Sequence, residues 1–145
     1  MMAKIKGRNT QPELTIRSLL HQQGLRFRIH DNTLPGTPDL VFKQHKAVIF
    51  VHGCYWHRHE HCKRGASTPK QNSGFWLKKF TANLHRDGQV YVALKLLDWR
   101  VAIIWECAVR DKENLAKHIK TLKTWLKSKN EYIEIPEILP ELNES

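Results

Sequence analysis

The chain has 145 residues, and its 24 Lys and Arg against 14 Asp and Glu give a formal net charge of +10. With 41% hydrophobic and 26% charged residues it is typical of one folded domain, which we take to span residues 1–145, and this composition argues against a disordered chain. No apolar stretch is long enough to cross a bilayer, and the first residues hold no apolar signal region. We therefore expect neither a membrane span nor a secretory signal.

The positive charge is unevenly distributed along the chain. Residues 131–145 contain five Glu and no Lys or Arg, and we expect an acidic tail from about 136 to 145, which we leave open as ordered or disordered. A small domain this basic suits a polyanionic partner. We favour nucleic acid over an acidic membrane surface, because the basic residues do not gather on one amphipathic helix. The simpler alternative is that the lysines only provide solubility.

The first predicted elements are a helix and a strand. Thr10 can cap a helix, Pro12 suits its first turn, and Glu13 completes a capping box. Gly24 is a natural end for this helix. Residues 25–29 then alternate between apolar and polar side chains, which predicts a strand with one wet face.

A β-hairpin is predicted next. Residues 38–42 and 47–51 are short apolar runs, and only residues 43–46 lie between them, which requires a hairpin. The second run is apolar on both faces, so we place it at the centre of the sheet.

The second half of the chain follows an irregular segment that ends near residue 74. Residues 75–97 are predicted as a helix that Gly88 could kink or split, and 99–105 as a strand. Asp111 can cap a helix that continues to Leu126, and 132–135 can add an edge strand. This order predicts an α/β or α+β layered sheet with helices packed against it.

The strongest candidate site is a metal centre. Two thiolates and an imidazole within nine residues, with a third cysteine at the end of a distant predicted strand, can form a tetrahedral zinc site: Cys54, His59, Cys62 and Cys107. An odd number of cysteines argues against a disulfide framework. His57 and His61 are alternatives to His59, and the simpler interpretation is three unrelated cysteines beside a chance histidine cluster. Four protein ligands leave no open position, so this zinc would be structural.

A second candidate site centres on Asp39. A hairpin turning at residues 45–46 would place Asp39 directly opposite His52. A carboxylate at a strand end suits Mg²⁺, and a neutral histidine can act as a base in phosphodiester hydrolysis. His52 and His57 are the nearest histidines outside the zinc set. A turn aspartate that only caps the backbone is an equally good interpretation of Asp39.

Four further residues have simpler structural interpretations on spacing alone. The capping role is favoured for Glu13, and an exposed position on a helix is favoured for Asp87. Tyr55 and Trp56 lie inside the zinc loop, where they could be wedges that enter a base stack or part of the core. On the residues alone we favour core for at least one of the two aromatics.

Several segments, taken together and in order, resemble the very-short-patch-repair (Vsr) family of DNA mismatch endonucleases. They are residues 34–39, 48–59, 75–79, Asn83, Arg86, Asp87, 99–101 and 105–107. The His-Gly-Cys-aromatic-Trp-His run that begins at His52 is highly specific, and the match extends from about Met2 to about Leu126.

The resemblance implies a fold and a reaction. The fold is restriction-endonuclease-like (of the PD-(D/E)XK type), with a central mixed sheet between layers of helices and a structural zinc. The reaction is the nicking of double-stranded DNA 5′ to the thymine of a T·G mismatch, which arises when 5-methylcytosine deaminates. The implied partners are a cytosine-5 DNA methyltransferase and the polymerase and ligase that finish repair. We further expect a monomer that acts on nucleoid DNA in the bacterial cytoplasm.

The resemblance also implies roles for individual residues. Asp39 and the backbone carbonyl of Val51 would bind Mg²⁺. His57 would be the general base with Asp87 as its orienting partner, and His52 and Glu13 would complete the active site. The zinc ligands are the four residues already proposed, and three side chains would insert beside the mismatch, namely Tyr55, Trp56 and Met2.

Two other classes of protein remain as alternatives. The charge and aromatic residues also fit a non-catalytic, zinc-stabilised DNA-binding module, which needs no active site. The clustered histidines also fit a nuclease of another fold in which they bind the catalytic metal.

Overall fold

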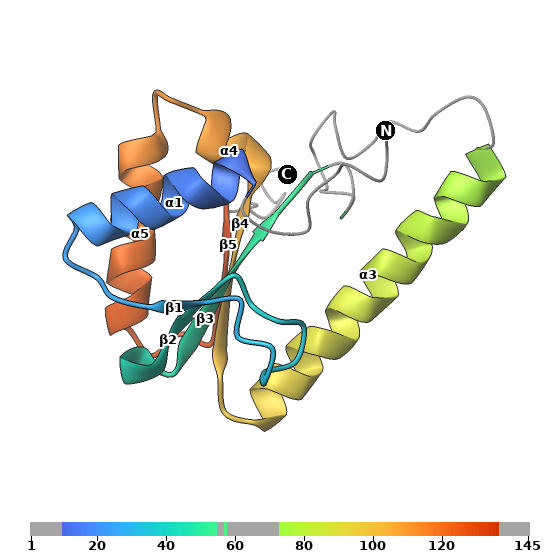
Figure 1. Cartoon of the computed structure of the whole chain (residues 1–145), viewed down its shortest axis with the longest axis horizontal. Helices are drawn as coiled ribbons and strands as arrows, with labels where there is room; N and C mark the ends of the chain where they lie inside the picture. Colours follow the sequence, from blue (N-terminus) through green and yellow to red (C-terminus); the bar gives the residue numbers. More distant parts are fainter. Residues whose placement is uncertain (1–9, 55–56, 58–72, 137–145) are drawn as a thin grey trace, which may run out of the picture.

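The computed structural model describes residues 10–54, 57 and 73–136, and a five-stranded mixed sheet forms its centre (Figure 1). The strands follow the order β1-β2-β3-β4-β5 across the sheet. Their bounds are β1 Arg28–Ile29, β2 Leu40–Phe42, β3 Ala47–His52, β4 Arg100–Trp105 and β5 Tyr132–Ile135. The first three strands pair antiparallel, whereas β3, β4 and β5 pair parallel. The predicted mixed sheet is therefore confirmed.

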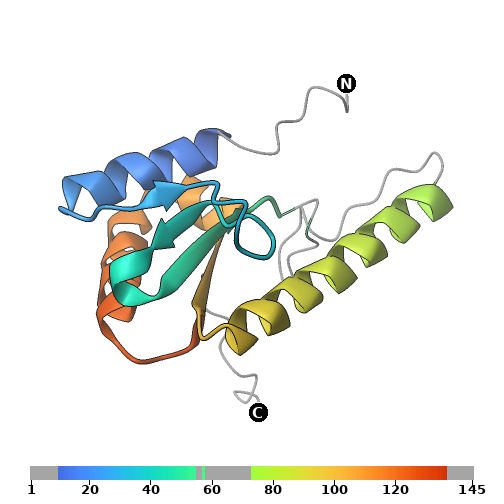
Figure 2. The same ribbon diagram turned by 60° about the horizontal axis from the view of Figure 1, so that its bottom comes forward.

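Helices cover both faces of the sheet, which gives three layers (Figures 1 and 2). Their bounds are α1 Gln11–Gln22, α3 Ser73–Leu96, α4 Glu106–Arg110 and α5 Leu115–Lys127, with a short 3-10 helix at Lys43–His45. Alternate residues of β3 face opposite layers: Ala47 and Ile49 pack towards α1 and α5, whereas Val48 and Phe50 pack towards α3. This burial on both faces is what the apolar run of β3 predicted.

The first helix is confirmed, but the first strand is shorter than expected. The hydroxyl of Thr10 accepts a hydrogen bond from the Glu13 backbone N–H at 3.4 Å, and Gly24 takes a left-handed conformation after the helix. Of the predicted strand 25–29, only β1 is paired. Because β2 ends at Phe42 and the 3-10 helix begins at Lys43, residues 25 and 26 have no strand partner opposite them.

The hairpin is confirmed, but its register differs from the prediction. Leu40 lies opposite Ile49, so one further step along the ladder sets Asp39 against Phe50 rather than against His52. The difference arises in the connection. The turn was expected at residues 45–46, whereas the chain uses a 3-10 helix at Lys43–His45 followed by Lys46 in a left-handed conformation.

The remaining elements are mostly as predicted. The helix α3 runs through Gly88 without a break, and its C-terminal half packs on the sheet while its other end extends from the body (Figure 1). Strands β4 and β5 are confirmed. The last helix was expected to follow a cap at Asp111 but begins at Leu115, and Asp111 instead accepts a hydrogen bond from the Asn114 side chain at 2.9 Å. Among the described helices, none is long and apolar enough to cross a membrane.

Candidate active site

Two groups of titratable side chains lie at the carboxyl end of β3. His52 is the last residue of this strand, and Asp39 comes just before β2, whose antiparallel direction places its start beside the end of β3. The Asp39 carboxylate accepts a hydrogen bond from the Val51 backbone N–H at 2.7 Å. This bond explains how the fold brings Asp39 within one residue of His52 despite the shifted register.

Asp39 belongs to a partly buried group of potential ligands that also contains Glu13, which is buried, and His30, with ligand atoms within 4.8 Å of one another. Burial raises the pKa of Asp39 to about 7, and the nearby Glu13 carboxylate adds to the increase. The Val51 N–H and the Arg17 guanidinium act in the opposite direction. A divalent cation would offset the repulsion between two carboxylates held this close together.

Glu13 not only occupies the capping position that spacing favoured but also forms side-chain ion pairs. Its carboxylate is almost fully buried and pairs with the Arg17 guanidinium and with His30 Nε2. His30 also donates its backbone N–H to the carbonyl of Asp39 at 3.2 Å. Neither Arg17 nor His30 was among the candidate residues that the sequence pattern indicated. The only available signal was that Arg17 follows Glu13 by four residues, the spacing at which helical side chains meet.

The chemistry of this first group fits Mg²⁺. The ion prefers oxygen ligands and commonly takes one or two carboxylates, with water and phosphate completing its shell. Asp39 and Glu13 supply such carboxylates beside the end of a buried strand. The backbone of Val51 lies next to the same group, through its hydrogen bond to Asp39.

The second group consists of His52, His57 and Asp87. The two imidazoles stack with their centroids 3.8 Å apart and their planes at 4°. His57 donates from Nδ1 to the Asp87 carboxylate at 2.6 Å, and the Tyr91 hydroxyl lies 3.5 Å from His52 Nδ1. The structure thus places Asp87, on α3, against His57, which follows β3. Spacing alone favoured an exposed Asp87, whereas its side chain is only 19% exposed.

Each member of this second group is suited to handling protons. The carboxylate that holds Nδ1–H of His57 leaves Nε2 as an acceptor. Burial, with a smaller effect of His57, holds the pKa of His52 well below its usual value, so His52 is neutral. A metal ion binds an imidazole in the plane of the ring. Because these two rings are parallel, one ion cannot lie in both planes, which argues against a catalytic metal bound by both histidines.

The structure brings together two of the four proposed zinc ligands. Cys54 follows β3 and Cys107 follows β4, and because these neighbouring strands are parallel, their ends meet. The Cys107 backbone N–H donates to Cys54 Sγ at 3.4 Å. The other candidate ligands, His59, Cys62 and the alternative His61, lie outside the described residues. So do the three proposed DNA wedges, which are Met2, Tyr55 and Trp56.

The chain is similar to a family of DNA-cleaving proteins. A family model described as DNA mismatch endonuclease Vsr matches residues 1–64. The chain is 43% identical over 127 residues to the DNA mismatch endonuclease Vsr of Escherichia coli, covering 86% of this chain and 80% of that protein. It is 43% identical over 122 residues to the type II nicking enzyme V.XorIIP of Xanthomonas oryzae, with 84% and 88% covered. For the type II nicking enzyme V.NmeAIP of Neisseria meningitidis the identity is 37%, with 85% and 89% covered. At this identity over most of both chains, the protein belongs to the Vsr family of DNA mismatch endonucleases.

Proposed function

We propose that the protein is a Mg²⁺-dependent endonuclease that nicks double-stranded DNA 5′ to the thymine of a T·G mismatch. The observation that carries this proposal is that a carboxylate group and a histidine group both lie at the carboxyl end of β3. The carboxylates of Asp39 and Glu13 lie on one side of this strand end, and the His57–Asp87 pair lies next to His52. Membership of the family supports the reaction, and the fold supports a restriction-endonuclease-like assignment.

We assign roles to the chain's own residues as follows. Asp39 and the backbone carbonyl of Val51 would hold Mg²⁺, which supplies charge stabilisation at the phosphate. His57 takes a proton from the attacking water at Nε2, and Asp87 fixes its tautomer. His52 stays neutral and donates a hydrogen bond to the phosphate.

Glu13 supports the metal site from α1. Its carboxylate pairs with Arg17 and His30. These contacts fix the orientation of the carboxylate beside Asp39.

The partners and the biological role follow from the resemblance. Tyr55, Trp56 and Met2 would insert beside the mismatch. The nick would start very short patch repair of deaminated 5-methylcytosine, alongside a cytosine-5 methyltransferase, a repair polymerase and a ligase. The protein would act as a monomer on bacterial nucleoid DNA in the cytoplasm.

The nicking assay that tests this function compares two duplexes that differ in one base. We expect Mg²⁺-dependent nicking of a duplex with a T·G pair, no nicking of the matched T·A duplex, and no nicking of either in EDTA. Labelling each strand separately locates the nick. Equal cutting of both duplexes would contradict the mismatch specificity, and no cutting in any flanking sequence would favour the non-catalytic DNA-binding module.

We also propose that zinc, held by Cys54, His59, Cys62 and Cys107, stabilises the loop beyond β3. The contact between Cys54 and Cys107 supports this proposal. Purified protein should retain one zinc ion per chain. Cys107→Ser should lose it and lower the Tm by about 10 °C or more, because a structural zinc contributes several kcal/mol to folding.

Two histidine variants identify which histidine binds the zinc. His59→Ala should lose zinc as Cys107→Ser does, whereas His61→Ala should retain it. Metal analysis after dialysis against Mg²⁺ measures both. Zinc-free protein with an unchanged Tm would contradict the proposal.

A further inference from the structure

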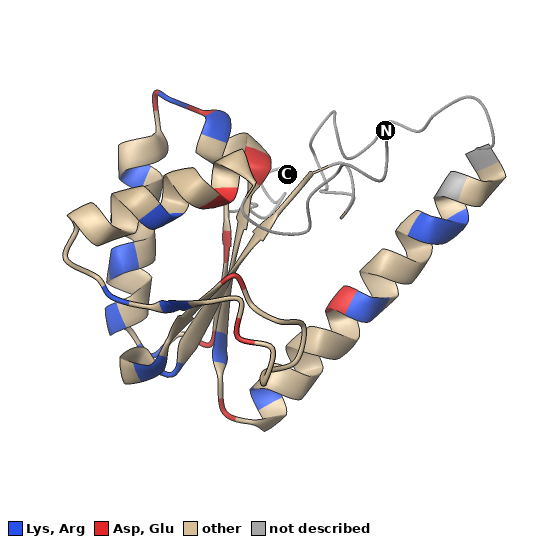
Figure 3. Ribbon diagram, viewed as in Figure 1, with Lys and Arg blue, Asp and Glu red and all other residues tan. Residues whose placement is uncertain are grey.

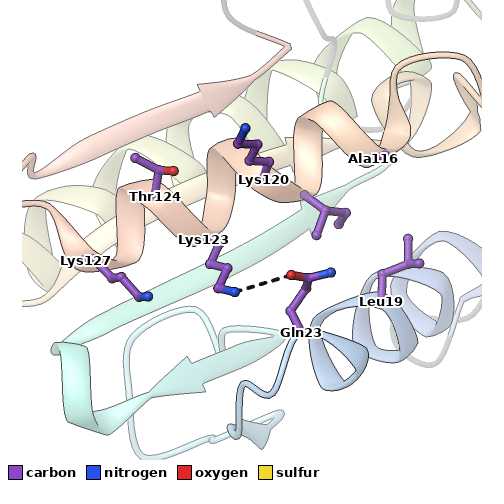
Figure 4. Close-up of a pocket in the computed structure, with 8 residues that line it drawn as sticks. Leu19, Gln23, Ala116, Lys120, Lys123, Thr124 and Lys127 are labelled. Carbon is purple, nitrogen blue, oxygen red and sulfur yellow. Dashed lines mark hydrogen bonds between the residues drawn. The ribbon is translucent and has the colours of Figure 1, made fainter.

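A groove on the side of the molecule away from α3 offers a second binding surface (Figure 4). It lies between the C-terminal half of α1 and the helix α5, and it holds about 530 Å³. Its polar lining consists of Gln23, Lys120, Lys123, Thr124 and Lys127. All five side chains can donate hydrogen bonds, and none of the lining residues is acidic.

The groove lies in a strongly basic part of the chain. Residues 115–130 contain five lysines and no Asp or Glu, and Lys and Arg positions recur along α5 in Figure 3. Within the groove, Lys123 donates to the Gln23 side-chain oxygen at 3.4 Å, so the two walls are linked by a cation and an amide (Figure 4). The chemistry therefore favours an anion.

The three groove lysines form a line on a fixed support. Positions 120, 123 and 127 share one face of a helix, and at a rise of about 1.5 Å per residue they span about 10 Å. One DNA strand carries a phosphate for about every 3.4 Å of helix axis, so the line can meet consecutive phosphates. The guanidinium of Arg100 holds the end of α5 in place by donating to the carbonyls of Trp125 and Leu126 at 3.1 and 2.9 Å.

The groove is distinct from the candidate active site. Glu13 lies in the first turn of α1, whereas Gln23 follows its last turn, about 15 Å further along the helix axis. The two sites are therefore on the same layer but at different ends of α1.

We propose that this groove is a second DNA contact, which holds the sugar-phosphate backbone of duplex outside the nicking site without reading its bases. The proposal depends on the family's DNA substrate and not on the catalytic assignments. An acidic protein helix is the weaker occupant, because such a partner needs apolar anchors in a row. The apolar lining is limited to Leu19, Ala116 and Ile119, and of these Ile119 is only 4% exposed, so the groove offers no row of apolar anchors.

A charge-reversal experiment with a matched control tests the proposal. Lys120→Glu/Lys123→Glu/Lys127→Glu changes the groove, and Lys43→Glu/Lys112→Glu/Lys117→Glu makes the same change in net charge at exposed lysines outside it. Binding to a long, fully matched duplex without Mg²⁺ is measured against salt concentration. We expect the groove variant to lose at least tenfold in affinity and to reduce the steepness of log K against log salt by about 2 to 3. The control variant should lose threefold or less.

Three further measurements keep the outcome decisive. Both variants should nick a short T·G duplex at saturating concentration like the unchanged protein, which separates failure of this proposal from failure of the proposed function. A glutamine triple at the same three positions repeats the test if the glutamate triple fails to fold. Equal losses in the groove and control variants would overturn the proposal. The proposal would also be overturned if the groove variant kept the salt dependence of its DNA binding but lost binding to an acidic peptide. That result would identify a protein-binding site instead.

Discussion

Asp39→Asn is expected to lower the rate of nicking by at least about 1,000-fold while leaving binding to T·G duplex within a fewfold of the unchanged protein. The substitution removes the negative charge that would hold Mg²⁺ in the proposed site. The amide oxygen can still accept the hydrogen bond from the Val51 N–H, so the loop before β2 keeps its anchor. Single-turnover nicking rates and a binding titration without Mg²⁺ measure the two effects separately.

Asp98→Asn is the matched control for this charge removal. Asp98 is exposed, precedes β4 at the opposite end of the sheet, and has a left-handed backbone that asparagine tolerates. Its variant should nick at the normal rate. Normal nicking by Asp39→Asn would contradict the assignment of the metal ligand, and a parallel loss of DNA binding would show that Asp39 acts on folding or binding instead.

The sequence predicted the neighbourhood of Asp39 for a reason that does not depend on register. Antiparallel pairing places the start of β2 beside the end of β3, so a shift of two residues still leaves Asp39 near His52. The hydrogen bond from Val51 to Asp39 confirms this closeness although the predicted partner was wrong. Similarly, the parallel pairing of β3 and β4 brings Cys54 to Cys107 from opposite halves of the chain.

Contacts that depend on tertiary packing could not be predicted from the sequence pattern. His30 reaches Glu13 from a left-handed backbone position, which periodicity does not reveal. Asp87 lies on α3, and only the packing of that helix against the sheet decides that it meets His57 rather than solvent. The short helix α4 was missed because five residues are too few to show a helical period.

The pairing of His57 with Asp87 leads to the second large expected effect. Asp87→Asn should lower the single-turnover nicking rate by about 100- to 10,000-fold, because an amide can donate to Nδ1 and so stabilise the tautomer in which Nε2 carries the proton. His57→Ala should cause a loss of at least similar size, since it removes the proposed base itself. His85→Ala, an exposed histidine on the same helix, is the control and should have no effect.

The double variant His57→Ala/Asp87→Asn distinguishes an orienting role from an independent one. If Asp87 acts through His57, removing the imidazole leaves it nothing to orient, and the double variant should be no slower than His57→Ala. If the loss in the double variant equals the product of the two single losses, Asp87 acts independently of His57, despite its 2.6 Å contact with Nδ1. A purely structural role of Asp87 would also lower the Tm. Because Asn is nearly the same size as Asp, we expect the Tm of Asp87→Asn to agree with that of the unchanged protein within about 3 °C. The combination of a large loss in rate, an unchanged Tm and a non-additive double variant is therefore specific to proton transfer at His57.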